Sequence, residues 1–346
     1  MCGRFASFHG PAVIRDAFST AGSIPNIAPS WNVTPTQAAM VRRASPRPSA
    51  VGIGAALRNK GRQGKGLLAK NHRYLATASS DAPLRFLALF LPSRLLLKIA
   101  TDSDIASMRA ALKGIGTLFL LNAVAPEELT QAVITLDLAR EAGVTNLVYL
   151  SVIHADRFSD VPHFTGKAAV ERMIADIEMP ATILRPGYYM QNDATLKDAV
   201  LGDGVYSIPL GTAGTLMVDT RDLAEVAAID LMRRDASADP LPTETIDVVN
   251  PEVLSGPGIA DIWSQLLGRT VTYGGDNLDA LEQSLQQFMP SWMAYDMRMM
   301  MRRFQEDGMS AEAGDDARLR ERLGRPMRTY RAFADETAAA WKEASA

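Results

Sequence analysis

The stretch Thr117-Leu-Phe-Leu-Leu-Asn122 decides the fold class, because it is a short, continuous apolar run that ends on a polar residue. Such a run is typical of a strand buried on both faces of a parallel sheet. Two more runs of this kind follow, at residues 146–151 and 181–184. Their regular return predicts one sheet of parallel strands.

The segments between these runs have helical spacing. Residues 127–141 carry apolar side chains three and four positions apart, and Gly143 follows as a stop signal. Residues 164–177 repeat the pattern. Strands that alternate with helices predict right-handed βαβ units, and hence an α/β fold with a doubly wound parallel sheet.

In such a sheet, ligands bind beyond the carboxyl ends of the strands. This rule points to Asn122, to Ser151 and to residues 185–187, which end the three predicted strands. We therefore expect the functional site at that edge of the sheet.

The composition excludes several other classes of protein. The chain has 346 residues, a formal net charge of −3 and one cysteine, Cys2, so it has neither an internal disulfide framework nor a multi-cysteine zinc site. The histidines lack metal-ligand spacing, and we expect no metal. The longest apolar run, residues 84–100, is interrupted by charges and a proline, so we expect no membrane span. We expect a reducing, cytoplasmic location.

The near-neutral net charge of the chain conceals a strong asymmetry of charge between its N-terminal part and the rest. Residues 1–75 hold eleven basic residues and one acidic residue, a net charge of +10, and the rest of the chain carries −13. The asymmetry is consistent with a basic arm that binds nucleic acid. It is equally consistent with two unrelated pieces of coding sequence that have been joined.

The N-terminal piece carries two motifs, MCGRFASF from residue 1 and PSWNVTPTQAAMVRR from residue 29. Here the chain resembles the SOS-response-associated peptidase family, which senses abasic sites in single-stranded DNA. The resemblance implies that Cys2 becomes N-terminal, and that its amine and thiol trap the aldehyde of an opened abasic sugar. It ends near Arg43, and the family's later Asn-Ala-Arg-Ala-Glu-type segment and histidine are missing. We interpret residues 1–43 as a fragment of that fold, with single-stranded DNA as a partner only if the fragment functions.

Residues 44–94 resemble no family, and we interpret them as a basic linker. They show neither helical nor strand periodicity, and their two glycine clusters lack the spacing of a phosphate-binding loop. Our hypothesis is that translation in a shifted frame joins the remains of two genes here.

From about residue 95 to residue 346 the chain carries a second set of motifs. They are DSDIASMRAALKGIGTLFLLN, NLVYLSVIHAD, HFTGKAAVERMI, ATILRPGYYMQN and MVDTRDLAEVAAIDLM. Their order resembles that of the NmrA-like family of atypical short-chain dehydrogenases/reductases. The resemblance implies a Rossmann-like domain that binds NADP or NAD, with a smaller C-terminal substrate region. The family contains reductases of quinones or azo dyes as well as non-catalytic redox sensors.

The resemblance also assigns roles to particular residues. Short-chain dehydrogenases use a serine at the strand end and a Tyr-x-x-x-Lys pair on the next helix. Here Ser151 and Lys167 are in place, but His163 stands at the tyrosine position. We expect the adjacent Lys167 cation to favour a neutral imidazole. This argues against carbonyl reduction and leaves open hydride transfer to a quinone or flavin-like acceptor.

The cofactor and substrate contacts follow from the same resemblance. The implied cofactor contacts are Leu121, Asn122, Ser151, Lys167 and Pro186, and the implied substrate pocket contains Tyr188, Tyr189 and Asn192. The six methionines of residues 289–301 are either core packing or an adaptable lid over an apolar substrate.

One feature departs from the family. The first βαβ unit, with its Gly-x-x-Gly-x-x-Gly turn, is replaced by residues 1–94. We expect cofactor affinity to fall without those backbone donors, and the sheet to lose a central strand and expose an apolar edge. The sequence thus predicts an NAD(P)-binding protein that reduces small acceptors. The alternatives are a non-catalytic redox-sensing regulator and a DNA-lesion sensor acting through Cys2.

Overall fold

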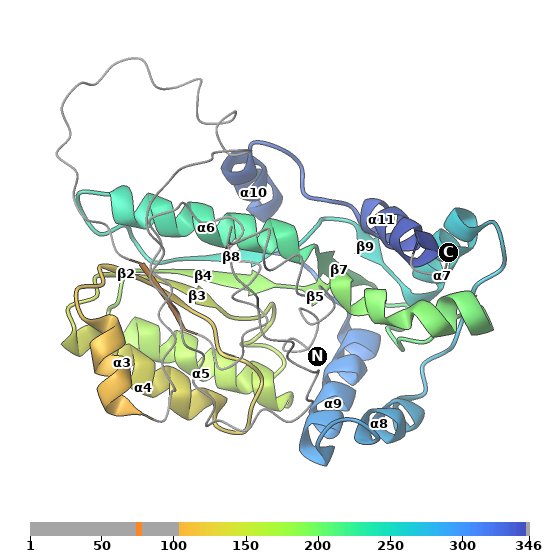
Figure 1. The fold of residues 1–346 in the computed structure, drawn as a ribbon, viewed down its shortest axis with the longest axis horizontal. Helices are drawn as coiled ribbons and strands as arrows, with labels where there is room; N and C mark the ends of the chain where they lie inside the picture. Colours follow the sequence, from red (N-terminus) through yellow and green to blue (C-terminus); the bar gives the residue numbers. More distant parts are fainter. Residues whose placement is uncertain (1–73, 78–103, 344–346) are drawn as a thin grey trace, which may run out of the picture.

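The computed structural model of the chain describes residues 74–77 and 104–343, and its centre is a five-stranded parallel sheet (Figure 1). The strand order is β1-β2-β3-β4-β8. The strands are β1 (Tyr74–Thr77), β2 (Thr117–Leu120), β3 (Asn146–Leu150), β4 (Ala181–Pro186) and β8 (Glu244–Val248). All four pairings are parallel, which confirms the predicted α/β fold.

Helices cover both faces of this sheet. Helices α3 (Ile105–Leu112), α4 (Glu128–Glu141) and α5 (Pro162–Asp176) lie on one face, and α6 (Thr220–Ala236) and α10 (Asp315–Leu323) lie on the other (Figure 1). Each face has its own hydrophobic core, with Leu118 and Tyr149 on the first side and Phe119 and Val148 on the second. This alternation of side chains explains why the strands are continuous apolar runs.

The predicted elements lie where the sequence places them. The observed α4 begins one residue after the predicted start, and α5 begins two residues earlier, with Pro162 in its first turn. Proline suits that position because the first helical amides need no partner within the helix.

The edge next to β2 differs from the sequence-based expectation. Strand β1 pairs with β2 from Tyr74 to Thr77, within the segment 44–94 that we interpreted as linker. The expected exposed edge at β2 is therefore wrong. Parallel pairing uses only backbone groups, so a segment without strand periodicity can supply them.

A second lobe, which contains α7, α8, α9 and α11, lies beside the sheet (Figure 1). Its short strands are β5 (Tyr188–Tyr189), β6 (Val205–Tyr206), β7 (Thr215–Val218), β9 (Val253–Leu254) and β10 (Thr272–Tyr273). Its helices are α7 (Gly256–Leu267), α8 (Leu278–Gln286), α9 (Ser291–Asp307) and α11 (Tyr330–Glu343), with a 3-10 turn over Met190–Leu196 and a π-helical turn over Asp198–Asp203. Its core includes Trp263, stacked on Trp341 with ring centroids 4.9 Å apart.

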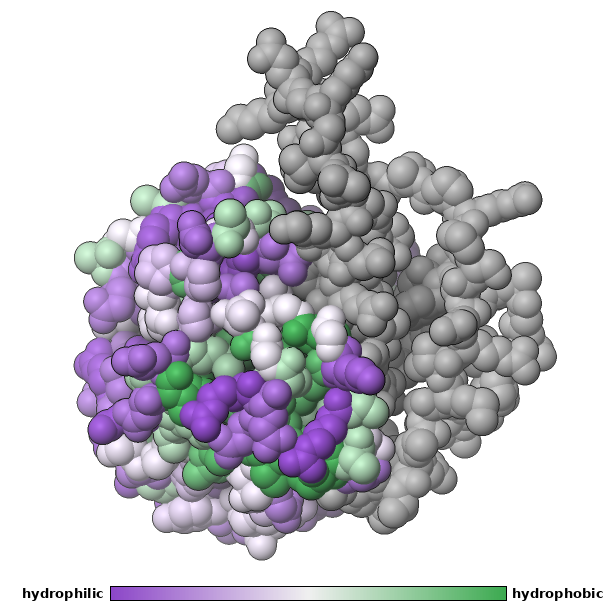
Figure 2. Space-filling view, turned by 90° about the vertical axis from the view of Figure 1, so that its left-hand side faces the viewer, coloured by the Kyte–Doolittle hydropathy of each residue, from purple (hydrophilic) through white to green (hydrophobic). Residues whose placement is uncertain are grey.

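The described surface seen from the α3–α4 side is mainly hydrophilic, with hydrophobic groups scattered among the polar ones (Figure 2). Asp104 caps the start of α3, because its side chain accepts a hydrogen bond from the amide of Ala106 at 3.1 Å. In the described helices we find no segment long and apolar enough to cross a membrane.

The fragment 1–43, with Cys2, and all of the 44–94 segment except Tyr74–Thr77 lie outside the described residues.

Candidate functional site

The strand ends bring the predicted site residues to one edge of the sheet. Beyond the strands, the amide of Ser151 donates to the carbonyl of Leu184 at 2.8 Å, and that of Ile153 donates to the carbonyl of Pro186 at 3.0 Å. Because Leu120 pairs with Tyr149, Asn122 leaves β2 at the same level. Adjacent parallel strands thus deliver their terminal residues side by side.

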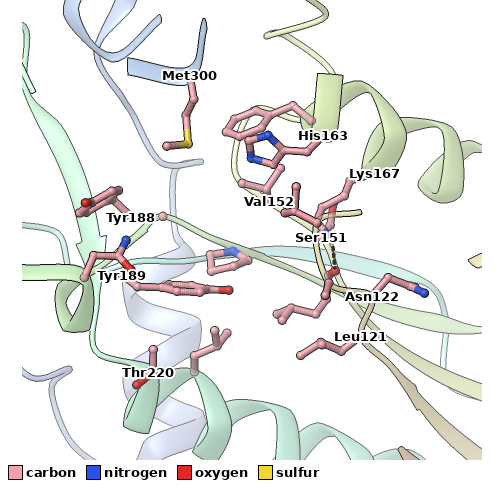
Figure 3. Close-up of a pocket in the computed structure, with 18 of the residues that line it drawn as sticks. Leu121, Asn122, Ser151, Val152, His163, Lys167, Tyr188, Tyr189, Thr220 and Met300 are labelled. Carbon is pink, nitrogen blue, oxygen red and sulfur yellow. Dashed lines mark hydrogen bonds between the residues drawn. The ribbon is translucent and has the colours of Figure 1, made fainter. Parts of the chain in front are cut away.

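A pocket opens at this edge, with about 1490 Å³ of empty space, part of it open to solvent. All the predicted pocket residues in the described part line it. They are Leu121, Asn122, Ser151, His163, Lys167, Pro186, Tyr188, Tyr189 and Asn192. Figure 3 shows Asn122, Ser151 and Lys167 on one side and the two tyrosines on the other, with His163 facing Met300.

Lys167 is held by a buried carboxylate. Its Nζ donates to Glu128 Oε1 at 2.7 Å, and to the carbonyl of Leu150 at 3.4 Å. Glu128 lies in the first turn of α4, and both side chains are less than one-tenth exposed. The Lys167 cation, which we expected near the cofactor, is therefore paired with a carboxylate from a neighbouring helix.

Ser151 is also engaged. Its hydroxyl donates to Glu171, and the same carboxylate accepts from Arg185 Nη2 at 2.6 Å and Nε at 3.0 Å. Burial opposes the charge of the Arg185 guanidinium, but the hydrogen bonds that it donates to Glu171 and the attraction of nearby carboxylates outweigh this and raise the pKa of Arg185. This chain of side chains fixes the serine at the end of β3.

His163 has a different partner from the expected one. Its Nδ1 lies 2.5 Å from Asp296 Oδ2, and its backbone amide donates to Asp296 Oδ1 at 3.1 Å. Asp296 comes from α9 and is fully buried. The expectation for His163 was based on Lys167 as the neighbouring charge. Lys167 is paired with Glu128, and the group in contact with the ring is a carboxylate.

The wall opposite the strand ends is apolar and comes largely from the second lobe. It is formed by Met297, Met300, Phe304 and Met309, with Phe164 of α5 beside them. The methionine-rich stretch packs in the core, and part of it also lines the pocket. Met289 and Met301 belong to the core, whereas Met297 and Met300 are buried and also face the pocket.

Several buried polar atoms at the pocket have no hydrogen-bond partner in the described structure. They are Asn122 Oδ1, Asn192 Oδ1 and Thr220 Oγ1. An unpaired buried polar atom is costly unless something satisfies it. These atoms therefore fit a ligand that carries hydrogen-bond donors, as the carboxamide and ribose of a nicotinamide cofactor do.

The start of α6 is fixed beside these atoms. Asp219 caps the helix by accepting from the amide of Arg221 at 2.9 Å, and Gln191 joins Asp219 to the amide of Thr220 with two bonds of 2.9 Å. Asp219 thus both caps α6 and forms an ion pair with Arg221.

Sequence reasoning missed the three carboxylates that hold the pocket residues. Glu128 and Glu171 look like ordinary helix charges. Asp296 had a usable signal, because it is the single acid among residues 289–301. An isolated acid in an apolar helix needs a buried partner. Among the described residues, no group of three or more His, Cys, Asp or Glu side chains is placed to hold a metal ion.

The sheet, its strand-end pocket and the two layers of helices define a Rossmann-like α/β protein. The chain belongs to the NmrA-like family, whose model matches residues 96–325.

Individual relatives agree with this assignment. The chain is 28% identical to NAD(P)H azoreductase of Xenophilus azovorans over 236 residues, which cover 68% of this chain and 80% of the relative. The NADPH complex of quinone oxidoreductase QOR2 from Escherichia coli superposes with a TM-score of 0.64 at 20% identity, covering 76% of this chain and 99% of that one. The negative transcriptional regulator Nmra superposes with a TM-score of 0.60 at 16% identity, covering 79% and 98%. At these identities the two structures establish the fold alone.

Proposed function

We propose that the chain binds NADP or NAD in the strand-end pocket and reduces small planar acceptors of the quinone or azo-dye kind. The observation that carries the proposal is the two-sided pocket. One wall offers the strand-end polar groups, and the other offers methionine and aromatic side chains. Membership of the NmrA-like family and the similarity to NAD(P)H azoreductase support this function over others.

The strand-end wall is where the described residues fit a nicotinamide group. Leu121, Asn122, Ser151, Lys167 and Pro186 would hold it, with Asn122 Oδ1 as a buried acceptor still without a partner in the described structure. When bound, the cofactor supplies a hydride. The acceptor would then lie against Tyr188, Tyr189, Asn192 and the methionine wall, within reach of His163.

The pyrophosphate half of the site departs from the family. The chain has no glycine between Thr77, which ends β1, and Gly114. A glycine turn at the first strand lets amides approach the pyrophosphate. Its loss predicts weak binding, with affinity that comes mainly from the nicotinamide half.

The test is a titration of the purified chain with NADPH and NADH, followed by nucleotide fluorescence. Saturable binding, weakened in Asn122→Leu, is expected. Gln283→Leu is the matched control, because it removes a similar amide from an exposed position on α8. A folded chain that binds neither nucleotide would refute the proposal.

One observation favours a second candidate, a non-catalytic redox-responsive regulator. Ser151 and Lys167, two residues of the dehydrogenase motif, are both engaged by carboxylates. Saturable nucleotide binding without consumption of NADPH across a series of quinones and azo dyes would support this candidate.

A third candidate rests on sequence resemblance alone. Covalent trapping of an abasic oligonucleotide, abolished in Cys2→Ala, would support a DNA-lesion sensor. We also propose a reducing cytoplasm as the location, because the chain has a single cysteine and so no internal disulfide.

A further inference from the structure

The contact between His163 and Asp296 joins two distant parts of the chain at the pocket. The residues are 133 positions apart, one in the first turn of α5 and the other on α9. Both oxygens of the carboxylate are used, and both bind the same residue, one at the ring and one at the backbone amide. The imidazole also packs edge-on against Phe164, with ring centroids 4.6 Å apart.

This arrangement restricts the histidine in two ways. A carboxylate oxygen can only accept, so Nδ1 must carry a proton to form the bond. The bond to the backbone amide fixes Asp296 relative to α5, and the ring cannot rotate without losing the carboxylate. The second ring nitrogen, Nε2, has no hydrogen-bond partner in the described part of the chain and remains for a molecule in the pocket.

A purely structural tie between helices does not explain these features well. Burial of a carboxylate is costly, and an apolar contact would join α5 to α9 at lower cost. The pair also lies at the pocket, because His163 is one of its lining residues. Outside the pocket, Asp160 already joins these regions through Arg303 Nε at 2.7 Å and through Arg302.

We propose that Asp296 is a positioning residue for His163, holding the Nδ1–H form of the ring so that Nε2 delivers a proton to the reduced acceptor. This inference rests on the proposed function, because the proton has a use only if an acceptor is reduced in the pocket.

The step balances as follows for a quinone. The bound cofactor would supply a hydride, which is one proton with two electrons, and a quinone that accepts it would become the hydroquinone monoanion. The imidazolium of His163 then gives its Nε2 proton to the anionic oxygen and becomes a neutral ring that keeps Nδ1–H. Asp296 keeps the Nδ1–H bond throughout, and solvent restores the Nε2 proton afterwards.

The first test needs no activity. The tautomer of His163 is read from ¹⁵N-labelled histidine by NMR, with the signal assigned by its absence in His163→Gln. We expect the neutral ring to carry its proton on Nδ1 in the wild type, and on Nε2 in Asp296→Asn, whose amide can instead donate to Nδ1. A wild-type ring protonated on Nε2, or a tautomer that does not change in the variant, would overturn the proposal.

The second test compares two acceptors that differ in their need for a proton. Menadione takes up a hydride and a proton, whereas crystal violet, a triarylmethane cation, takes up a hydride alone. We expect Asp296→Asn to lower the ratio of menadione kcat to crystal violet kcat by about a hundredfold, within the range of a lost proton donor. Glu306→Gln, which removes an exposed carboxylate from the same helix, should leave the ratio unchanged.

A double variant separates positioning from structural support. If Asp296 acts through His163, then adding Asp296→Asn to His163→Gln should lower the ratio no further. An equal loss with both acceptors, or independent losses in the double variant, would refute the proposal. Failure of the wild type to reduce either acceptor would count against the proposed function, and the tautomer measurement would still decide the role of Asp296.

Discussion

The buried ion pair between Lys167 and Glu128 yields a sharp prediction about stability. The substitution Lys167→Met removes the ammonium but keeps an unbranched side chain of similar length. It leaves the Glu128 carboxylate, which is 6% exposed, without its cation. We expect the free energy of unfolding to fall by about 3–5 kcal/mol, as for other buried pairs that lose one partner.

The size of this effect follows from the geometry. At the observed Nζ–Oε1 distance of 2.7 Å, the attraction is about 6 kcal/mol for an effective dielectric constant of about 20. The cost of removing both charges from water offsets most of that attraction in the intact pair. In the variant the carboxylate keeps its desolvation cost and loses the attraction. The second substitution Glu128→Gln removes the remaining charge, so the double variant should recover most of the loss.

The measurement is urea unfolding, followed by tryptophan fluorescence and far-UV circular dichroism, for the wild type, both single variants and the double variant. Lys342→Met is the matched control, because Lys342 is exposed on α11 and should change stability by less than about 0.5 kcal/mol. A loss below about 1 kcal/mol in Lys167→Met, or a double variant less stable than Lys167→Met, would refute the reasoning.

Two other positions, Gly187 and Asp193, give predictions about packing and about pH dependence. In Gly187→Ala the new Cβ would lie 2.4 Å from the Leu216 carbonyl oxygen and 2.9 Å from Val249 Cγ1. The free energy of unfolding, measured with urea, should therefore fall by about 1–3 kcal/mol. Burial raises the pKa of Asp193 to about 7, so its native carboxyl binds a proton more tightly than the unfolded one. The contribution of this proton to the free energy of unfolding is fully present in acid. It is lost as pH rises from about 4 to about 7, by up to about 4 kcal/mol. Asp193→Asn should remove this part of the pH dependence when urea midpoints are compared at pH 5 and pH 8.

Each of these predictions has its own control. Gly166 lies in α5, and a Cβ added there would have nothing within 4 Å, so Gly166→Ala should be neutral or stabilising by about 0.5–1 kcal/mol. Equal losses at Gly166 and Gly187 would show that the close approach to Leu216 is not the cause. For Asp193, an unchanged pH slope in the variant would show that its carboxyl is ionised throughout the range.

The fold was predictable because a strand buried on both faces has a local signature. Every side chain of Thr117–Leu120 and Asn146–Leu150 is buried, and the sequence shows this directly as continuous apolar runs. Asn122 and Ser151 were predictable for a related reason, because parallel strands end at a common edge.

The partners of the pocket residues could not be predicted in the same way. Lys167 meets a glutamate 39 positions earlier, and His163 meets an aspartate 133 positions later. No local pattern encodes which helix will approach another across a pocket. The interpretation of His163 considered Lys167, four residues away on the same helix, because the sequence gives no means to place Asp296 beside the ring.

Strand β1 shows that the edge of a parallel sheet can pair with a segment from outside the family's matched region. Residues 74–77 precede residue 96, where the match to the family begins, yet they add to β2 in register from Tyr74 opposite Thr117. The edge strand has unpaired backbone amides and carbonyls, and almost any extended segment can form hydrogen bonds with them. A parallel sheet can thus gain an edge strand from residues that lie outside the match to its family. For evolution this makes the margin of a parallel sheet a tolerant place for genes to recombine, and for protein engineering it marks a place to graft new segments.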